Sequence, residues 1–265
     1  MNQTDRWIVS QSDTVPDVFK GIGKIIHQEP ENFLRCLAEF SDSENTDYYD
    51  AWNKVNRTVN GLQTDYINAV PWSDMQVFNI LSQQVPDNTI IHLGNSSPVR
   101  YAQFFHWKQG IQFFGNRGAA GIDGSTSTAI GMASQTDKLV TLITGDVSFL
   151  YDSNALWNQY KKKNFKIIVI NNKGGNIFSL IPGPESTGLL EDYFVTHIPV
   201  SIEHLCSAYG IGYYRAQNET ELSSGLEQCY ADPNCALMEV QTDPSTNTQV
   251  WKDYFTTIKN KFQYE

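Results

Sequence analysis

The sequence is poor in cations, has no long hydrophobic run and contains few cysteines. Its 19 Lys and Arg residues stand against 29 Asp and Glu residues, which leaves a net charge of −10. General binding to nucleic acid or to an anionic membrane is excluded, because both need a basic surface. An anionic small substrate stays open, since it needs only a few local cations. No apolar run approaches the ~20 residues that cross a bilayer, so we expect no membrane span.

The four cysteines are too scattered to suggest a disulfide framework or a zinc site. They form no C-x-x-C pair, and no histidine stands at zinc-ligand spacing from them. Such cysteines are typical of free thiols in a reducing compartment. The first residues, MNQTDRW, lack the basic stretch and apolar segment of a secretory signal. We therefore expect a cytoplasmic protein.

The pattern of the chain changes near residue 73. Residues 1–72 are polar and irregular, with helices expected over 31–40 and 46–60 and a loop between them. From residue 73 onward, short apolar runs alternate with helical segments. The expected strands are 89–93, 111–114, 139–144, 166–170, 212–216 and 236–242, and the expected helices are 73–84, 125–134, 152–162, 201–209 and 219–230.

This alternation predicts an α/β fold with a doubly wound, mostly parallel sheet and helices on both faces. Strands separated by helices are joined by right-handed crossovers, which place the helices over the sheet. A chain of 265 residues is long enough for one large domain, or for one domain and part of a second. Residues 73–265 therefore form the α/β domain, and residues 1–72 are not a complete domain.

Two strand ends of the predicted sheet carry unusual residues. The strand over 139–144 ends in Gly145-Asp146, and the strand over 166–170 ends in Asn171-Asn172 before two glycines. Parallel sheets bind ligands at the carboxyl ends of their strands. A carboxylate and an amide oxygen are hard ligands that suit Mg²⁺, which often retains phosphate oxygens. The backbone N–H groups of 146–148 and the helix expected from 152 could receive a diphosphate, although either motif alone is often only a turn.

These motifs resemble those of a known family. Gly-Asp followed by Asn-Asn is similar to the thiamine diphosphate fingerprint, although Val147 replaces its third residue, a glycine. The segments GNRGAAGIDGSTSTAIG (115–131), GDVSFLYDSNALW (145–157) and NNKGGNIFSLIP (171–182) resemble the 2-succinyl-5-enolpyruvyl-6-hydroxy-3-cyclohexene-1-carboxylate synthase family, the MenD family. The likeness implies a thiamine diphosphate-binding fold, with residues 73–265 as the diphosphate-binding domain. Residues 1–72 would be a remnant of the central domain with a linker.

The resemblance also implies a cofactor site. Asp146, the side chain of Asn172 and the carbonyl group of Gly174 would ligate Mg²⁺, or Mn²⁺ in its place. The diphosphate would contact Gly145, Val147, Ser148 and Gly175, and Ile122 would lie under the bent cofactor. An ordinary core isoleucine remains the alternative for Ile122.

A substrate site follows from the same resemblance. The family uses 2-oxoglutarate and isochorismate, whose carboxylates suit the planar fork of arginine. Ser96, Arg100 and Arg117 would bind these substrates, and Ile177, Phe178 and Ile181 would form an apolar wall. The alternatives are surface ion pairs for the two arginines and a core aromatic for Phe178.

The resemblance assigns no catalytic residue to this chain. The family's catalytic glutamate lies in a pyrimidine-binding domain, which is not recognisable here, and the active site forms against that domain of a second subunit. We therefore expect a homo-oligomeric carboligase whose chain, by itself, is inactive and binds the cofactor weakly or not at all. Another thiamine diphosphate-dependent decarboxylase or carboligase, or a non-catalytic cofactor-binding domain, are the alternatives.

Overall fold

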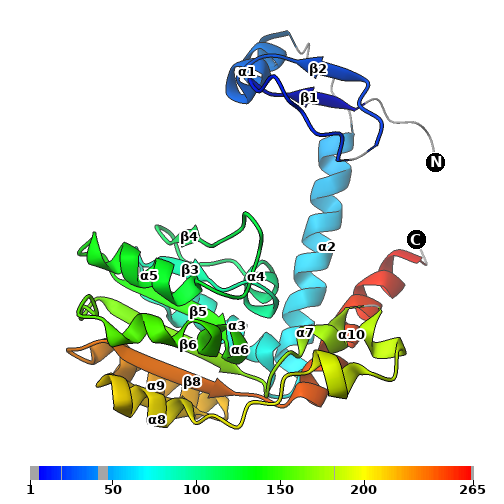
Figure 1. The fold of residues 1–265 in the computed structure, drawn as a ribbon. Helices are drawn as coiled ribbons and strands as arrows, with labels where there is room; N and C mark the ends of the chain where they lie inside the picture. The colour runs from blue at the N-terminus through cyan, green and yellow to red at the C-terminus, as the bar shows by residue number, and fades with distance from the viewer. Residues whose placement is uncertain (1–5, 19, 41–46, 182, 264–265) are drawn as a thin grey trace. The chain divides into compact units, whose positions relative to one another are not determined.

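A computed structural model describes residues 6–18, 20–40, 47–181 and 183–263 (Figure 1). The chain divides into two compact units, Met1–Thr58 and Val59–Glu265. They are called the N-terminal unit and the sheet unit, and each is described by itself. Most of the loop expected between the first two helices falls at 41–46, outside the described residues.

The N-terminal unit contains a short parallel pair of strands and two helical segments. Strand β1 (Trp7–Val9) pairs with β2 (Lys24–Ile26) in parallel. Helix α1 (Pro30–Phe40) matches the helix expected over 31–40. Helix α2 (Tyr48–Ala69) begins in this unit and runs beyond the predicted end at residue 60.

The sheet unit is built on six parallel strands in the order β4-β3-β5-β6-β8-β7 (Figure 1). Their bounds are β3 Ile90–Leu93, β4 Gln112–Phe114, β5 Val140–Gly145, β6 Phe165–Asn171, β7 Gly212–Ala216 and β8 Ala236–Gln241. Each lies within about one residue of its predicted position. The predicted parallel α/β sheet is confirmed.

Both faces of this sheet are covered by helices. Because successive strand residues point to opposite faces, Ile168 and Ile170 belong to one hydrophobic cluster, and Ile167 and Val169 belong to the other. The first cluster takes in α3 (Asp74–Gln84), α4 (Ser97–Ala102), α9 (Glu219–Ala231) and α10 (Pro244–Gln263). The second takes in α5 (Ser125–Ser134), α6 (Asp146–Tyr151) and α8 (Ile202–Tyr209).

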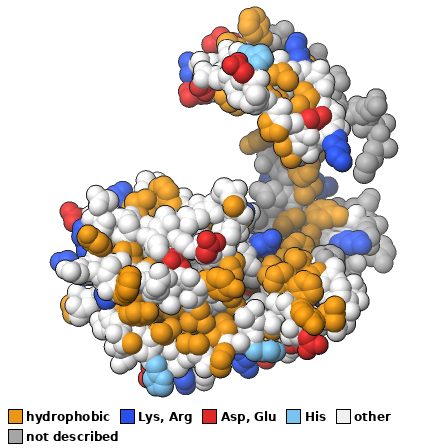
Figure 2. All heavy atoms as spheres, viewed as in Figure 1, with side chains coloured by type: hydrophobic (Ala, Val, Ile, Leu, Met, Phe, Trp, Pro, Cys, Tyr) orange, Lys and Arg blue, Asp and Glu red, His pale blue; other side chains and the backbone are white. Residues whose placement is uncertain are grey.

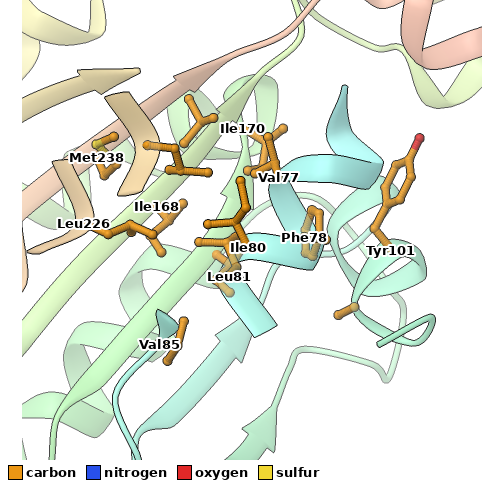
Figure 3. Packing of buried hydrophobic residues seen from close by; sticks show 14 of the residues in the cluster. Val77, Phe78, Ile80, Leu81, Val85, Tyr101, Ile168, Ile170, Leu226 and Met238 are labelled. Atoms are coloured by element: carbon orange, nitrogen blue, oxygen red, sulfur yellow. The ribbon is translucent and has the colours of Figure 1, made fainter. Parts of the chain in front are cut away.

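The contact between α3 and the sheet anchors one end of the site. Val77, Ile80 and Leu81 of α3 pack near Ile168 and Ile170 of β6 (Figure 3). All five are buried, and burying a side chain of this size contributes about 1.5–3 kcal/mol. Helix α3 is therefore held firmly over the strand that leads to Asn172.

The prediction of a helix over residues 152–162 is wrong. Helix α6 begins at Asp146, directly after β5, and ends at Tyr151, and only a short 3₁₀ turn over Ser153–Trp157 follows. The carboxylate of Asp152 accepts hydrogen bonds from the N–H and hydroxyl groups of Ser127, both at 2.6 Å. Asp152 therefore caps the start of α5 instead of starting a helix of its own. Helices α4 and α10 were not predicted.

Among the described residues, no helix has both the length and the apolar character that crossing a membrane requires.

Candidate functional site

A cavity of about 310 Å³ lies at the carboxyl ends of β3, β5 and β6. Most of the predicted site residues line it, namely Ser96, Ile122, Gly145, Asp146, Val147, Ser148, Asn172, Gly175, Ile177 and Phe178. Its wall does not include Gly174, Arg100, Arg117 or Ile181. Segments that are far apart in the sequence thus meet where a parallel sheet is expected to bind ligands.

Asp146 is the buried carboxylate of this cavity. Its Oδ1 accepts a hydrogen bond from the N–H of Val147 at 2.7 Å, and its Oδ2 accepts one from the N–H of Gly174 at 2.8 Å. Burial and, to a lesser extent, the negative charge of Asp74 raise its pKa to about 6, against the lowering effect of these hydrogen bonds. Each oxygen keeps a second lone pair, so the carboxylate can still bind a cation.

Asn172 is held by a second buried carboxylate, which sequence reasoning missed. The Nδ2 group of Asn172 donates to Oδ2 of Asp74 at 2.9 Å. Asp74 is the first residue of α3, is 1% exposed and lines the cavity. Burial raises its pKa, and hydrogen bonds from Thr242, Asn172 and Asn247 lower it. In the sequence, Ser73-Asp74 is typical of a helix start, so no local signal singled Asp74 out.

The loop after β6 turns through backbone conformations that favour glycine. Lys173, Gly174 and Gly175 have φ angles of 64°, 91° and 58°. A Cβ atom at Gly174 would lie 1.7 Å from the carbonyl oxygen of Thr196, and one at Gly175 would lie 2.8 Å from that of Phe194. The glycines thus let the backbone of 194–196 pack directly against this loop, which directs the N–H of Gly174 toward Asp146.

Ile122 and Ser148 are linked within the cavity wall. The hydroxyl group of Ser148 donates to the backbone carbonyl of Ile122. The resemblance implied that this hydroxyl contacts a diphosphate, whereas here it holds the segment that carries Ile122. Ser148 is the third residue of α6, so the helix start and the Ile122 segment are fixed to each other.

The two predicted substrate arginines are anchored on neighbouring residues after β3. Arg100 donates to the carbonyl oxygen of Ser96 at 2.9 Å, and Arg117 donates to Oδ1 of Asn95 at 2.5 Å. Asn95 is buried and also donates to the carbonyl groups of Asn116 and Gly121. Both arginines are exposed, and their anchors line the cavity. Two positively charged side chains are therefore anchored on the cavity wall.

Aromatic and aliphatic side chains form the other side of the cavity. Phe178 packs at a tilt against Phe194, with 5.4 Å between the ring centres. Ile177 is buried at the start of α7 (Ile177–Leu180), while Ile181 follows this helix and is only partly buried. Tyr193, which sequence reasoning missed, also lines the cavity and is 78% exposed.

The donor set fits a divalent cation with a diphosphate. The described residues contain no group of three His, Cys, Asp or Glu side chains arranged to hold a metal ion. Asp146 and the amide oxygen of Asn172 supply hard ligands, and phosphate oxygens would complete such a shell. The Nδ2 group of Asn176, on the cavity wall, is buried and has no hydrogen-bond partner among the described residues. This NH₂ group can therefore donate a hydrogen bond to an oxygen atom of a ligand.

Comparison with known proteins agrees with this geometry. The chain is 40% identical over 197 residues to 2-succinyl-5-enolpyruvyl-6-hydroxy-3-cyclohexene-1-carboxylate synthase of Christiangramia forsetii, covering 74% of this chain and 34% of that protein. It is 38% identical over 243 residues to the synthase of Flavobacterium johnsoniae, covering 91% and 44%. It is 35% identical over 269 residues to that of Porphyromonas gingivalis, covering 97% and 46%. The chain thus spans less than half the length of these relatives.

A solved structure confirms the predicted fold class. Benzoylformate decarboxylase from Polynucleobacter necessarius matches with a TM-score of 0.57 at 19% identity, covering 67% of this chain and 34% of that one. The similarity to the synthases confirms the resemblance seen in the sequence. Residues 94–240 match the family described as thiamine pyrophosphate enzyme, C-terminal TPP binding domain. Since this match extends over more than half of the chain, the protein belongs to the thiamine pyrophosphate enzyme family.

Proposed function

We propose that this chain supplies the diphosphate-binding side of a thiamine diphosphate-dependent carboligase. The enzyme decarboxylates 2-oxoglutarate and adds the resulting succinyl semialdehyde unit to isochorismate in menaquinone biosynthesis. The similarity to the synthases supports the reaction. The observation that carries the proposal is the meeting of Asp146 and Asn172 at one cavity, tied together through the Gly174 loop.

Mg²⁺ would be held by Asp146, by Oδ1 of Asn172 and by the carbonyl group of Gly174, with Mn²⁺ as a substitute. Gly145, Val147, Ser148 and Gly175 lie around the place of the diphosphate. When bound, thiamine diphosphate supplies a nucleophilic carbon and accepts the electron pair that is released with carbon dioxide. The protein's contribution is to position the cofactor and to complement its charge.

The remaining side chains of the cavity would orient cofactor and substrates. Ile122 would lie under the cofactor, where the Ser148 hydroxyl fixes its backbone. Arg100 and Arg117 would bind substrate carboxylates together with Ser96, because guanidinium groups pair with carboxylates in two parallel hydrogen bonds. Ile177 and Phe178, which line the cavity, would form the apolar wall.

A second protein surface would close the site. The exposed aromatic residues that line the cavity include Tyr151 and Tyr193, which are 66% and 78% exposed. Hydrophobic side chains also occupy much of the visible face of the sheet unit (Figure 2). The pyrimidine-binding domain of a second subunit, which would carry the catalytic glutamate, is the proposed partner. The active form is then a homo-oligomer, and the chain by itself is inactive.

Binding of metal and cofactor tests the site directly. Mn²⁺ with excess thiamine diphosphate is added to the ¹⁵N-labelled chain, and paramagnetic broadening of the amide signals is recorded. This readout detects even weak binding. We expect the amides of 145–148 and 172–175 to broaden first. Broadening elsewhere would overturn the proposed site, and so would the absence of selective broadening both in the chain alone and in the chain assembled with a pyrimidine-binding domain.

Two activity measurements test the rest of the proposal. The chain alone should give no steady turnover of 2-oxoglutarate with isochorismate, and sustained turnover would contradict its inactivity. In the enzyme assembled with a pyrimidine-binding domain, Arg100→Met with Arg117→Met should abolish use of the dicarboxylate 2-oxoglutarate. Unchanged use of 2-oxoglutarate would overturn the proposed role of the two arginines in binding substrate carboxylates.

A further inference from the structure

The two adjacent asparagines at the carboxyl end of β6 are each held by a buried carboxylate. The Nδ2 group of Asn171 donates to Glu239 of β8 at 2.6 Å, and that of Asn172 donates to Asp74 of α3 at 2.9 Å. Glu239 and Asp74 are 4% and 1% exposed. Neighbouring residues of an extended chain point to opposite faces, so different elements fix the two amides.

Asp74 is itself locked in place by a closed set of hydrogen bonds. Its Oδ1 accepts from the hydroxyl of Thr242 at 2.7 Å, and its N–H donates to Oδ1 of Asn247 at 2.8 Å. The Nδ2 group of Asn247 in turn donates to the Thr242 hydroxyl at 3.0 Å. All three residues are buried. The carboxylate therefore presents its other oxygen, Oδ2, to Asn172 in one orientation.

This contact decides which end of the Asn172 amide is available to a ligand. A carboxylate only accepts hydrogen bonds, so it binds the NH₂ end of the amide. No donor among the described residues contacts Oδ1 of Asn172, and the residue lines the cavity beside Asp146. The amide oxygen is thus the atom left for a cation.

We propose that Asp74 is a positioning residue of the cation site, whose carboxylate holds the Asn172 amide so that its oxygen is the ligand atom. The inference rests on the proposed function, because Asn172 acts there on a divalent cation. Replacing a residue that orients a metal ligand typically lowers metal affinity 10–100-fold. Asp74 also adds a second buried negative charge to the cavity wall, which favours a cation there.

The substitution Asp74→Asn reverses the polarity of the contact at nearly constant shape. The Thr242 hydroxyl would still donate to the side-chain oxygen, so the new NH₂ group would face Asn172. Asn172 would then turn its own oxygen toward that group and away from the cavity. We expect Mn²⁺ to bind roughly 10–100-fold more weakly in the presence of thiamine diphosphate, measured by electron paramagnetic resonance and amide broadening.

A matched control and a rescue variant separate positioning from a general structural role. Asp152→Asn changes another buried carboxylate, which caps α5 and does not line the cavity, and it should leave Mn²⁺ affinity unchanged. The exchange Asp74→Asn with Asn172→Asp restores the donor–acceptor pair and supplies a carboxylate oxygen to the cation. It should recover most of the lost affinity.

Each outcome decides between the two proposals. If neither the wild-type chain nor the chain assembled with a pyrimidine-binding domain shows selective broadening at 145–148 and 172–175, the proposed function fails. If the wild-type chain binds Mn²⁺ and Asp74→Asn binds it equally well, only the role of Asp74 is overturned. Equal losses in Asp74→Asn and Asp152→Asn also overturn it. If Asp74→Asn does not fold, the side-chain NH₂ signals of Asn172 in the wild-type chain decide: a shift typical of hydrogen bonding supports the contact, and free-amide shifts overturn it.

Discussion

The backbone N–H of Gly174 donates a hydrogen bond to Oδ2 of Asp146 across 2.8 Å. This bond joins the loop after β6 to the carboxylate that follows β5, two strands that pair in parallel. The carboxylate is therefore oriented before any ligand arrives. A cation that binds there meets a group that need not be ordered first, which lowers the entropy cost of binding.

The ionisation of Asp146 makes the free chain less stable as the pH rises. Its pKa is raised from 3.8 to about 6, mainly by burial. The native state then binds a proton more tightly than the unfolded state, so the contribution of Asp146 to stability is fully present below about pH 4 and is lost as the pH rises through about 6. The substitution Asp146→Asn should remove a decline of roughly 2–3 kcal/mol between pH 4 and 7.

Urea unfolding of both proteins at several pH values measures this decline. The two curves of stability against pH should differ in slope between pH 4 and 6 and run parallel above pH 7. Equal slopes throughout that interval would show that Asp146 titrates normally.

Asp243 has the opposite pH behaviour. It precedes Pro244 of α10 and accepts hydrogen bonds from Thr246 N–H, Thr246 Oγ1 and Ser245 Oγ, which lower its pKa to about 2. Its stabilisation is present above about pH 4 and is lost as the pH falls through 2. The substitution Asp243→Ala should cost about 1 kcal/mol at pH 7, as for other helix caps, and clearly less at pH 2.

Asp243→Asn provides the control, because it keeps a capping oxygen and removes the charge. It should cost less than Asp243→Ala at pH 7, since asparagine is also a good cap. Thermal unfolding at pH 7 and pH 2 measures both differences. A cost of Asp243→Ala that does not change with pH would refute the capping role.

The substitution Gly174→Ala should displace the backbone over 194–196. The new methyl group would meet the carbonyl oxygen of Thr196, and the residue would keep a φ of +91°. Gly188→Ala is the matched control, because its φ is +69° and nothing lies within 4 Å of the added atom. The control should cost only the conformational strain, about 1–2 kcal/mol, and Gly174→Ala should cost more.

Amide hydrogen exchange locates the damage in these variants. We expect faster exchange over 190–196 in Gly174→Ala and not in Gly188→Ala. Equal free energies of unfolding for the two variants would mean that the close approach to Thr196 contributes nothing.

The contact between Ser148 and Ile122 predicts a selective loss of binding. Ser148→Ala removes the hydrogen bond to the carbonyl group of Ile122 and loosens the segment that we propose to lie beneath the cofactor. Thiamine diphosphate should then bind several-fold more weakly, whereas inorganic pyrophosphate, which does not reach Ile122, should bind almost unchanged. Competition with Mn²⁺-induced broadening measures both affinities. Equal losses for the two ligands would place the Ser148 hydroxyl on the diphosphate instead.

The strands could be predicted from the sequence because each is a short apolar run bounded by polar turns. Their parallel order then placed Asp146 and Asn172 at one edge of the sheet, where the structure has them. Asp74 could not be found in this way, because a Ser-Asp pair at the start of a helix is ordinary. Its role follows only from its hydrogen bond with Asn172, which lies 98 positions later in the sequence.

A long-range contact also explains why the prediction of a helix over residues 152–162 is wrong. An acidic residue before a polar, partly apolar stretch favoured a helix start at Asp152. Its carboxylate caps α5 instead, a partner 25 positions earlier that local periodicity cannot reveal. The same holds for Arg117, whose anchor Asn95 lies 22 positions earlier, whereas Arg100 contacts Ser96 only four positions away.

Ser96 is one of the few described residues other than glycine with a positive φ, at 74°. A side chain in this region of backbone space is disfavoured by about 1–2 kcal/mol, a penalty that glycine would escape. Ser96 nevertheless lines the cavity, so its hydroxymethyl group can contact a ligand that binds there. Under the proposed function, the chain gives up folding free energy at one position to keep a polar contact with substrate, and Ser96→Gly would yield a more stable but less selective protein.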